Sequence, residues 1–298
     1  MNKTKGISAV MIAAIIYGFT PILGKFTYLE GSNTMSLTFY RSLLSLPIIY
    51  AILKAKKVSL SVTKSEFMKL TILGILGPSI TALMLYGAYN YISVGMSTTL
   101  HYIYPVLVTA VCIIIFKEKI SKEKIIAVIL STIGVALFFD GDFTKNIIGI
   151  LLALISGLTY GTHILFMDKS GIKGMYPFKF TFYACLTSSV FLFIVGIATK
   201  SLVFHMSPIG WFYTLLVSIL VSVFANALMP VAINNVGSTV TSIVGMFEPI
   251  TSVIFGILFL QEAITFKNTM GIAAIITAVL LLTLSKENKT EINTLQQK

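Results

Sequence analysis

Long apolar stretches constrain this chain more than any other feature of its sequence. Its residues are 56% hydrophobic and only 11% charged, whereas soluble proteins are about 25% charged. Ten stretches are each close to the roughly 20 apolar residues that a helix needs to cross a bilayer: 7–26, 34–53, 67–89, 97–116, 124–139, 147–167, 177–199, 211–233, 238–260 and 268–284. The sequence therefore predicts an all-α membrane protein with ten transmembrane helices.

Basic residues predict the orientation of these helices. If there are ten, 17 lysines fall on the side that carries both termini and four fall on the other side. Positively charged loops stay in the cytoplasm, so we expect a multi-pass protein of the cell (plasma) membrane with both termini cytoplasmic. This distribution also accounts for the net charge of +11 without a nucleic-acid partner.

The second half of the chain repeats the first. The Tyr17-Gly18 pair recurs as Tyr160-Gly161, 143 residues later, and the Ala-Leu-Met triplet at 82–84 recurs at 227–229, an offset of 145. In each half a proline precedes a glutamate by 13 residues, at 105 and 118 and again at 249 and 262. Such offsets indicate a duplication.

An odd number of helices in each unit has a consequence for topology. Five helices per unit make the second unit enter the membrane inverted with respect to the first. We therefore expect two inverted five-helix repeats, residues 1–143 and 144–285, followed by a polar cytoplasmic tail, 286–298. Inverted repeats with interrupted helices are typical of alternating-access transporters, whose site lies near the midplane.

The doubled pattern of proline, glutamate and glycine resembles the EamA repeat of the drug/metabolite transporter superfamily. The residues that carry the resemblance are Pro105, Glu118, Gly134, Pro249, Glu262 and Gly271, and Arg41 matches an arginine common in the family's second helix. The resemblance implies a ten-helix exporter or exchanger of amino acids, metabolites or drugs. It also implies that helices 1 to 4 and 6 to 9 line the cavity, with helices 5 and 10 outside.

Glu248 is the residue on which the functional prediction rests. It lies inside an apolar stretch, where an ionisable group costs roughly 3 kcal/mol or more. We expect it to face a cavity and bind a substrate amine or a proton. The alternative is a structural carboxylate that pairs with Arg41 or with tyrosine hydroxyls.

Arg41 is the second ionisable residue within an apolar stretch. Its guanidinium could bind a substrate carboxylate in a bidentate manner, or it could pair with Glu248. A zwitterion placed between the two residues would satisfy both groups, so amino acids head the expected substrates.

Other polar residues in the apolar stretches are weaker candidates. His101 and Tyr104 share a helix face at i, i+3, and His101 is either a proton relay or a neutral hydrogen-bonded residue. Tyr17 and Tyr160 occupy equivalent repeat positions and line the pathway or simply pack. Polarity alone adds Tyr40, Tyr86, Tyr102 and Asn226. His163 precedes Asp168 and Lys169, which favours a place at the membrane interface, and Glu118 is expected to cap a helix or pair with Lys122.

The motifs that the sequence lacks narrow the function. No phosphate-binding GxxxxGK[ST] motif is present, so direct use of ATP is not expected, and no GxSxG or HExxH motif indicates an enzyme. The two cysteines, Cys112 and Cys185, are not in a CxxC pattern, and we expect neither a metal nor a cofactor.

Three functions remain open. The leading prediction is a secondary active transporter that exports or exchanges a small polar metabolite such as an amino acid. A rival is a broad-specificity efflux protein for apolar cations. A third, of another class, is an intramembrane enzyme or a non-transporting sensor. The expected partners are the small-molecule substrate, the lipid bilayer and, as one option, a second copy in a homodimer.

Overall fold

The computed structural model describes residues 2–92, 94–137, 146–172, 174–260 and 265–284, and in these ranges it is helical, with no strand. The elements are α1 (Lys3–Leu29), α2 (Thr34–Ala55), α3 (Lys64–Gly74), η1 (Ile75–Thr81), α4 (Ala82–Ala88), α5 (Val94–His101), α6 (Tyr104–Ile114), α7 (Lys122–Ala136), α8 (Ile147–Lys169), α9 (Pro177–Ala198), α10 (Pro208–Val217), η2 (Ser218–Ala225), α11 (Asn226–Gly245), α12 (Glu248–Leu260) and α13 (Phe266–Leu284). The predicted 286–298 tail and Glu262 lie outside the described residues.

The length and apolar composition of the helices agree with a membrane protein. Seven helical stretches of the described residues are long and apolar enough to cross a bilayer, and a shorter apolar helix lies at Thr269–Leu281. Helices occupy parts of each of the ten predicted ranges. Polar residues fix several helix starts: Asn33 accepts a hydrogen bond from the Ser36 amide, and Thr63 and Glu66 form a capping box at α3, as expected of helix N-termini.

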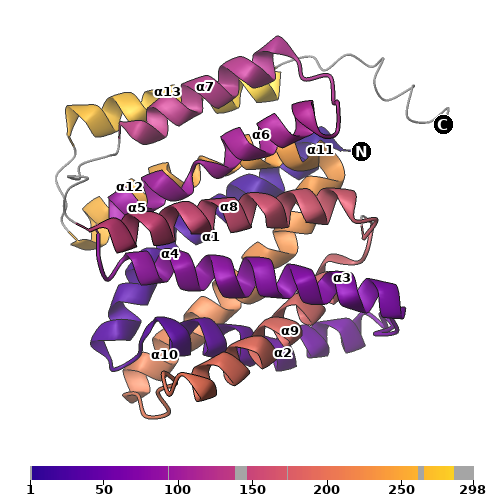
Figure 1. The fold of residues 1–298 in the computed structure, drawn as a ribbon, viewed down its shortest axis with the longest axis vertical. Helices are drawn as coiled ribbons and strands as arrows, with labels where there is room; N and C mark the ends of the chain where they lie inside the picture. The colour runs from indigo at the N-terminus through magenta and orange to yellow at the C-terminus, as the bar shows by residue number, and fades with distance from the viewer. Residues whose placement is uncertain (1, 93, 138–145, 173, 261–264, 285–298) are drawn as a thin grey trace.

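The helices pack side by side in a bundle (Figure 1). Helix α1 contacts α10, α11 and α12, while α2 contacts α9 and α4 contacts α8. Helices α7 and α13 form a pair at one side of the bundle (Figure 1). Gly134 allows this pair to approach closely, since a Cβ atom there would lie 2.9 Å from the Gly271 carbonyl oxygen.

Two of the predicted helices, 97–116 and 238–260, are each interrupted shortly before their proline. The breaks fall between His101 and Tyr104 and between Gly245 and Glu248, so that Pro105 and Pro249 lie in the first turns of α6 and α12 and do not disrupt a continuous helix. Proline lacks an N–H, which a first-turn residue does not need. A further kink lies at Gly237, where φ is 77°.

Two π-helices were not foreseen from the sequence. Segment η1 follows α3 and segment η2 follows α10, and their first residues, Ile75 and Ser218, are 143 positions apart. This separation equals that of the Tyr-Gly pairs. A π-helix disrupts the regular i to i−4 pairing and is frequent at functional sites. Segment η1 lines the pocket described next, and η2 ends directly before Asn226, which also lines it.

Candidate functional site

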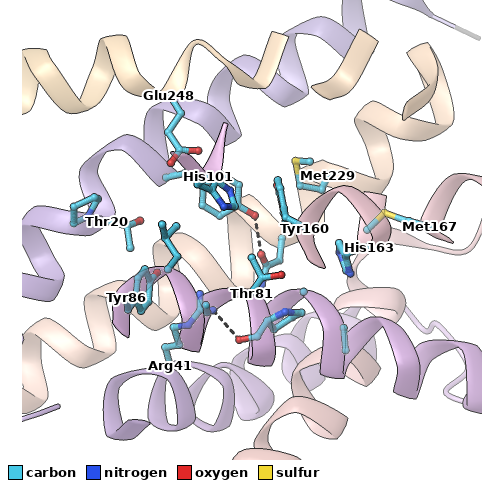
Figure 2. Close-up of a pocket in the computed structure, with 18 of the residues that line it drawn as sticks. Thr20, Arg41, Thr81, Tyr86, His101, Tyr160, His163, Met167, Met229 and Glu248 are labelled. Carbon is cyan, nitrogen blue, oxygen red and sulfur yellow. Dashed lines mark hydrogen bonds between the residues drawn. The ribbon is translucent and has the colours of Figure 1, made fainter. Parts of the chain in front are cut away.

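A pocket lies in the interior of the bundle, lined by residues of α1, α2, η1, α4, α5, α8, α9, α11 and α12 (Figure 2). Segments from both halves of the chain therefore form one site. Seven of the ten predicted site residues line it: Tyr17, Arg41, Tyr86, His101, Tyr160, Asn226 and Glu248.

Glu248 is the first residue of α12 and the one carboxylate among the residues that line this pocket. A helix N-terminus favours a negative group because its unpaired N–H groups carry partial positive charge. The Tyr102 hydroxyl donates to the Gly245 carbonyl oxygen at 3.4 Å, directly before the break that precedes α12. The break before α12 thus places an acidic side chain at the wall of a pocket within an apolar bundle.

Arg41 lies on α2, is 4% exposed, and contacts both π-helices. Its Nη2 donates to the Pro78 carbonyl oxygen of η1 at 3.0 Å, and its own carbonyl oxygen accepts a hydrogen bond from the Ser218 hydroxyl of η2 at 2.8 Å. The guanidinium carbon lies 5.6 Å from the centre of the Tyr86 ring. These contacts hold the Arg41 side chain at the pocket.

The two charged side chains do not pair with each other. Figure 2 shows Glu248 and Arg41 on opposite sides of the pocket, and the part of the chain that the structure describes contains no ion pair between them. The Arg41 Nε is buried and has no hydrogen-bond partner among the described residues. The pocket therefore presents a carboxylate and a guanidinium that are both available to a bound molecule.

Polar side chains between these groups connect helices from both halves. The Tyr17 hydroxyl donates to Asn226 Oδ1 at 2.8 Å, which leaves the Asn226 Nδ2 without a partner among the described residues. His101 Nδ1 is 2.8 Å from the Ser156 hydroxyl. Each contact joins a helix of residues 1–143 to a helix of residues 144–285, as expected for a site between two repeats.

The residues matched by a known family extend over almost the whole chain. The EamA-like transporter family matches residues 4–140 and 147–284, which are the two halves that carry the repeat. This chain belongs to the EamA-like transporter family. The resemblance inferred from the proline, glutamate and glycine pattern is thus confirmed.

Named relatives of this EamA-like protein are described as transporters. A protein of Clostridium kluyveri, named an uncharacterized transporter, is 25% identical over 288 residues, 91% of each chain. The uncharacterized transporter YvbV of Bacillus subtilis is 31% identical over 212 residues, 67% of each chain. A solved crystal structure covers 95% of this chain and 98% of its own, with a TM-score of 0.79 at 13% identity, so the two proteins share a fold.

Three of the predicted site residues do not line the pocket of the EamA-like protein: Tyr40, Tyr102 and Tyr104. Tyr40 packs away from the pocket, with its ring centre 4.8 Å from that of Trp211. Tyr104 is buried in a layer behind the pocket wall, where its ring packs against Tyr160 at 4.8 Å. Tyr40 lies on α2, which contributes Arg41 to the pocket, whereas Tyr102 and Tyr104 lie in and directly after the break between α5 and α6.

His163 lies inside the bundle, and it was not among the predicted site residues. It is 7% exposed, lines the pocket, and packs against Gly77, where a Cβ atom would lie 2.5 Å from the His163 ring. The sequence does indicate that His163 lines the pocket, because His163 follows Tyr160 by three residues and therefore shares its helix face. Tyr89, Met167 and Phe180 also line the pocket and were missed as well.

Glu118 forms an ion pair at a helix end, as expected, but with a different partner. Its carboxylate contacts Lys169 at the end of α8 instead of the Lys122 four residues along the chain. Lys169 also lies 3.5 Å from the Asp168 carboxylate. The contact therefore joins α8 to the segment that follows α6.

Proposed function

We propose that this chain is a secondary active transporter that exports or exchanges a small zwitterionic metabolite of the amino-acid type. In this proposal, ten membrane helices form two inverted five-helix repeats, and both termini lie in the cytoplasm. The repeats move against each other and expose the pocket to each side of the plasma membrane in turn. A proton gradient acting through Glu248, or exchange of substrates, supplies the energy.

The observation that supports the substrate class is the separate placement of two opposite charges around one pocket. Glu248 and Arg41 line the same cavity on opposite sides and do not pair (Figure 2). A buried charged group without a partner is costly. A ligand that carries both an ammonium and a carboxylate satisfies both groups, whereas a ligand without charged groups leaves both unsatisfied.

Arg41 is suited to the carboxylate of that ligand. Guanidinium groups bind carboxylates through two parallel N–H donors. One donor, Nη2, is held by the Pro78 carbonyl, and the Nε remains without a partner among the described residues. The nearby Asn226 Nδ2, also unpartnered in the described part of the chain, supplies a further donor.

The positions of the irregular segments support the proposed pair of inverted five-helix repeats. The π-helices begin 143 residues apart, and α6 and α12, each with a proline as second residue, begin 144 residues apart at Tyr104 and Glu248. Irregular or broken helices at equivalent positions of two halves are typical of inverted-repeat transporters. The family and the names of the relatives indicate transport, and we propose no enzymatic reaction.

One rival function has an observation in its favour. Four tyrosines line the pocket together with Glu248: Tyr17, Tyr86, Tyr89 and Tyr160. Aromatic rings next to a carboxylate suit an apolar cation, as in a broad-specificity efflux protein. Arg41 opposes this function, because a positive group in the pocket repels a cation that carries no anion.

Counterflow in proteoliposomes tests the proposal. We expect wild-type protein to exchange at least one zwitterionic amino acid of a panel, and Arg41→Gln and Glu248→Gln each to lower the rate at least roughly tenfold, since a hydrogen bond to a charged group contributes about 1.5–3 kcal/mol. Lys25→Gln removes an exposed charge of α1 outside the pocket and serves as the control. Zwitterion transport retained by both pocket variants, or wild-type flux of cationic dyes alone, would contradict the proposal.

A further inference from the structure

Each of the two charged pocket residues belongs to a wall that is held in place on its own side of the cavity. The Arg41 guanidinium donates to the Pro78 carbonyl oxygen of η1 at 3.0 Å. Glu248 begins α12, and the first turns of this helix are held on α1 by the Ser252 hydroxyl, which donates to the Gly18 carbonyl oxygen at 3.0 Å. The two charges are therefore presented from two separately anchored elements.

These two elements pack in different parts of the bundle. Helix α12 packs against α1 and α13, whereas α2, which carries Arg41, packs against α9, α10 and η2. Figure 2 accordingly shows Glu248 and Arg41 on opposite sides of the pocket. An α-amino acid carries its ammonium and its carboxylate on one carbon atom, so its ammonium stays on the Arg41 side when its carboxylate binds there. A ligand that pairs with both residues needs a longer chain between its two charges.

The polar groups of the pocket indicate what this chain consists of. The Tyr17 hydroxyl, the Thr81 hydroxyl and His101 Nδ1 each form a hydrogen bond of 2.8 Å to another side chain. Apolar side chains such as Leu85 and Met229 line the same cavity. An amide in the ligand would lose its water without gaining a free partner from these groups, whereas methylene groups gain from burial. The pocket therefore suits a methylene chain.

The charges of the pocket limit the number of charged groups on the ligand. Among the residues that line this pocket, Glu248 is the one carboxylate and Arg41 the one permanently charged base. A second ammonium on the ligand would be buried without a carboxylate to pair with, which is costly. One ammonium and one carboxylate match the pocket.

We infer that the transported zwitterion is an ω-amino acid, with its carboxylate on Arg41, its terminal ammonium on Glu248 and a chain of methylene groups between them. The inference rests on the proposed function and narrows its substrate class from zwitterions in general to those with widely separated charges.

A series of chain lengths tests the inference. Calorimetry on purified protein in nanodiscs would compare glycine, 3-aminopropanoate, 4-aminobutanoate, 5-aminopentanoate, 6-aminohexanoate and 7-aminoheptanoate. We expect the highest affinity at 4-aminobutanoate or a longer member, at least roughly tenfold above that of glycine, which corresponds to about 1.4 kcal/mol, because only a chain of matching length pairs both charges. Equal affinities along the series, or the highest affinity at glycine or 3-aminopropanoate, would overturn the inference.

Two matched pairs of ligands test the chain and the charge separately. Glycylglycine separates its charges by the same number of atoms as 5-aminopentanoate but contains an amide, and lysine is 6-aminohexanoate with a second ammonium. We expect the ω-amino acid to bind more tightly in each pair. Tighter binding of glycylglycine would indicate a peptide and tighter binding of lysine a diamino acid, and either result would overturn the inference.

A variant that shortens one wall gives the sharpest test. Glu248→Asp withdraws the carboxylate by one methylene, so the preferred ligand should become the next longer member of the series. Glu66→Asp makes the same change in the capping box of α3, outside the pocket, and should leave the preferred length unchanged. The preference is measured within each variant, so a partly destabilised protein still reports it. An unchanged preference in Glu248→Asp would refute the pairing of ammonium and Glu248.

The remaining outcomes distinguish this inference from the proposed function. If α-amino acids bind more tightly than every ω-amino acid, the inference is wrong and the proposed function stands. If cationic dyes bind and no zwitterion does, both are wrong.

Discussion

At the scale of single residues, Gly18 determines where Glu248 lies. A Cβ atom at Gly18 would lie 1.9 Å from the Thr251 hydroxyl oxygen and 2.8 Å from the Glu248 carbonyl oxygen. The Ser252 hydroxyl donates to the Gly18 carbonyl oxygen at 3.0 Å. Helix α1 therefore touches the first turn of α12 through its backbone, and this contact fixes the start of the helix that carries the pocket carboxylate.

Replacing Gly18 by alanine should separate the two helices. We expect Gly18→Ala to lower the unfolding free energy by about 1–3 kcal/mol, as overpacking does, and to lower transport by moving Glu248. Gly24→Ala in the same helix is the control, because a Cβ atom there meets Leu37 at an ordinary 3.6 Å. Thermal unfolding and counterflow measure both effects, and equal behaviour of the two variants would contradict this contact.

Several of the site residues could be predicted because of their chemistry. Glu248 and Arg41 stand out in apolar stretches, where ionisable groups are costly. Their separation could not be predicted, because it depends on Arg41 binding the Pro78 carbonyl oxygen of a π-helix. The burial of His163 could not be predicted from its distance along the helix, because its helix face decides which residues it contacts.

At the scale of elements, the kink at Gly237 creates a new helix start. Gly237 has φ 77° and ψ 172°, a conformation that residues with a side chain strongly disfavour. The Asp168 carboxylate at the end of α8 then accepts hydrogen bonds from the Ser238 amide at 3.3 Å and the Ser238 hydroxyl at 2.9 Å. Asp168 acts as the cap of the segment after the kink, from a different helix.

Removal of this cap should destabilise the protein. We expect Asp168→Ala to cost about 1–2 kcal/mol, the range for loss of a helix cap, measured as a lower melting temperature in detergent. Lys169→Ala is the neighbouring control and should cost about 0–1 kcal/mol, since its side chain is 30% exposed. A Lys169→Ala shift as large as that of Asp168→Ala would show that the local ion pairs, and not the cap, provide the stability.

The positions of the helices could be predicted from the sequence more accurately than the points at which they are interrupted. Each predicted range contains helix because apolar length is a local property. The π-helices depend on partners far away in the chain, such as the Ser218 hydroxyl that donates to the Arg41 carbonyl oxygen. Prolines marked the interrupted regions but not the break points, since proline fits best just after a break.

At the scale of the whole molecule, the two halves are alike in pattern but differ in charge. Thr81 and Asn226 both line the pocket at an offset of 145. Glu248, however, corresponds at an offset of 144 to Tyr104, and the same offset matches Arg41 with the apolar Cys185. The two halves thus hold one negative and one positive side chain without counterparts at these offsets, and in the proposed function a zwitterion would therefore bind in one orientation.

The most direct test of this account is a binding comparison in which only ligand charge changes. Calorimetry on wild-type protein would compare the tightest-binding zwitterion with the amine that lacks its carboxylate and the acid that lacks its amino group. The account predicts that removing either charge weakens binding at least roughly tenfold, because Arg41 or Glu248 is then left without a partner. Binding of the amine as tight as that of the zwitterion would contradict it.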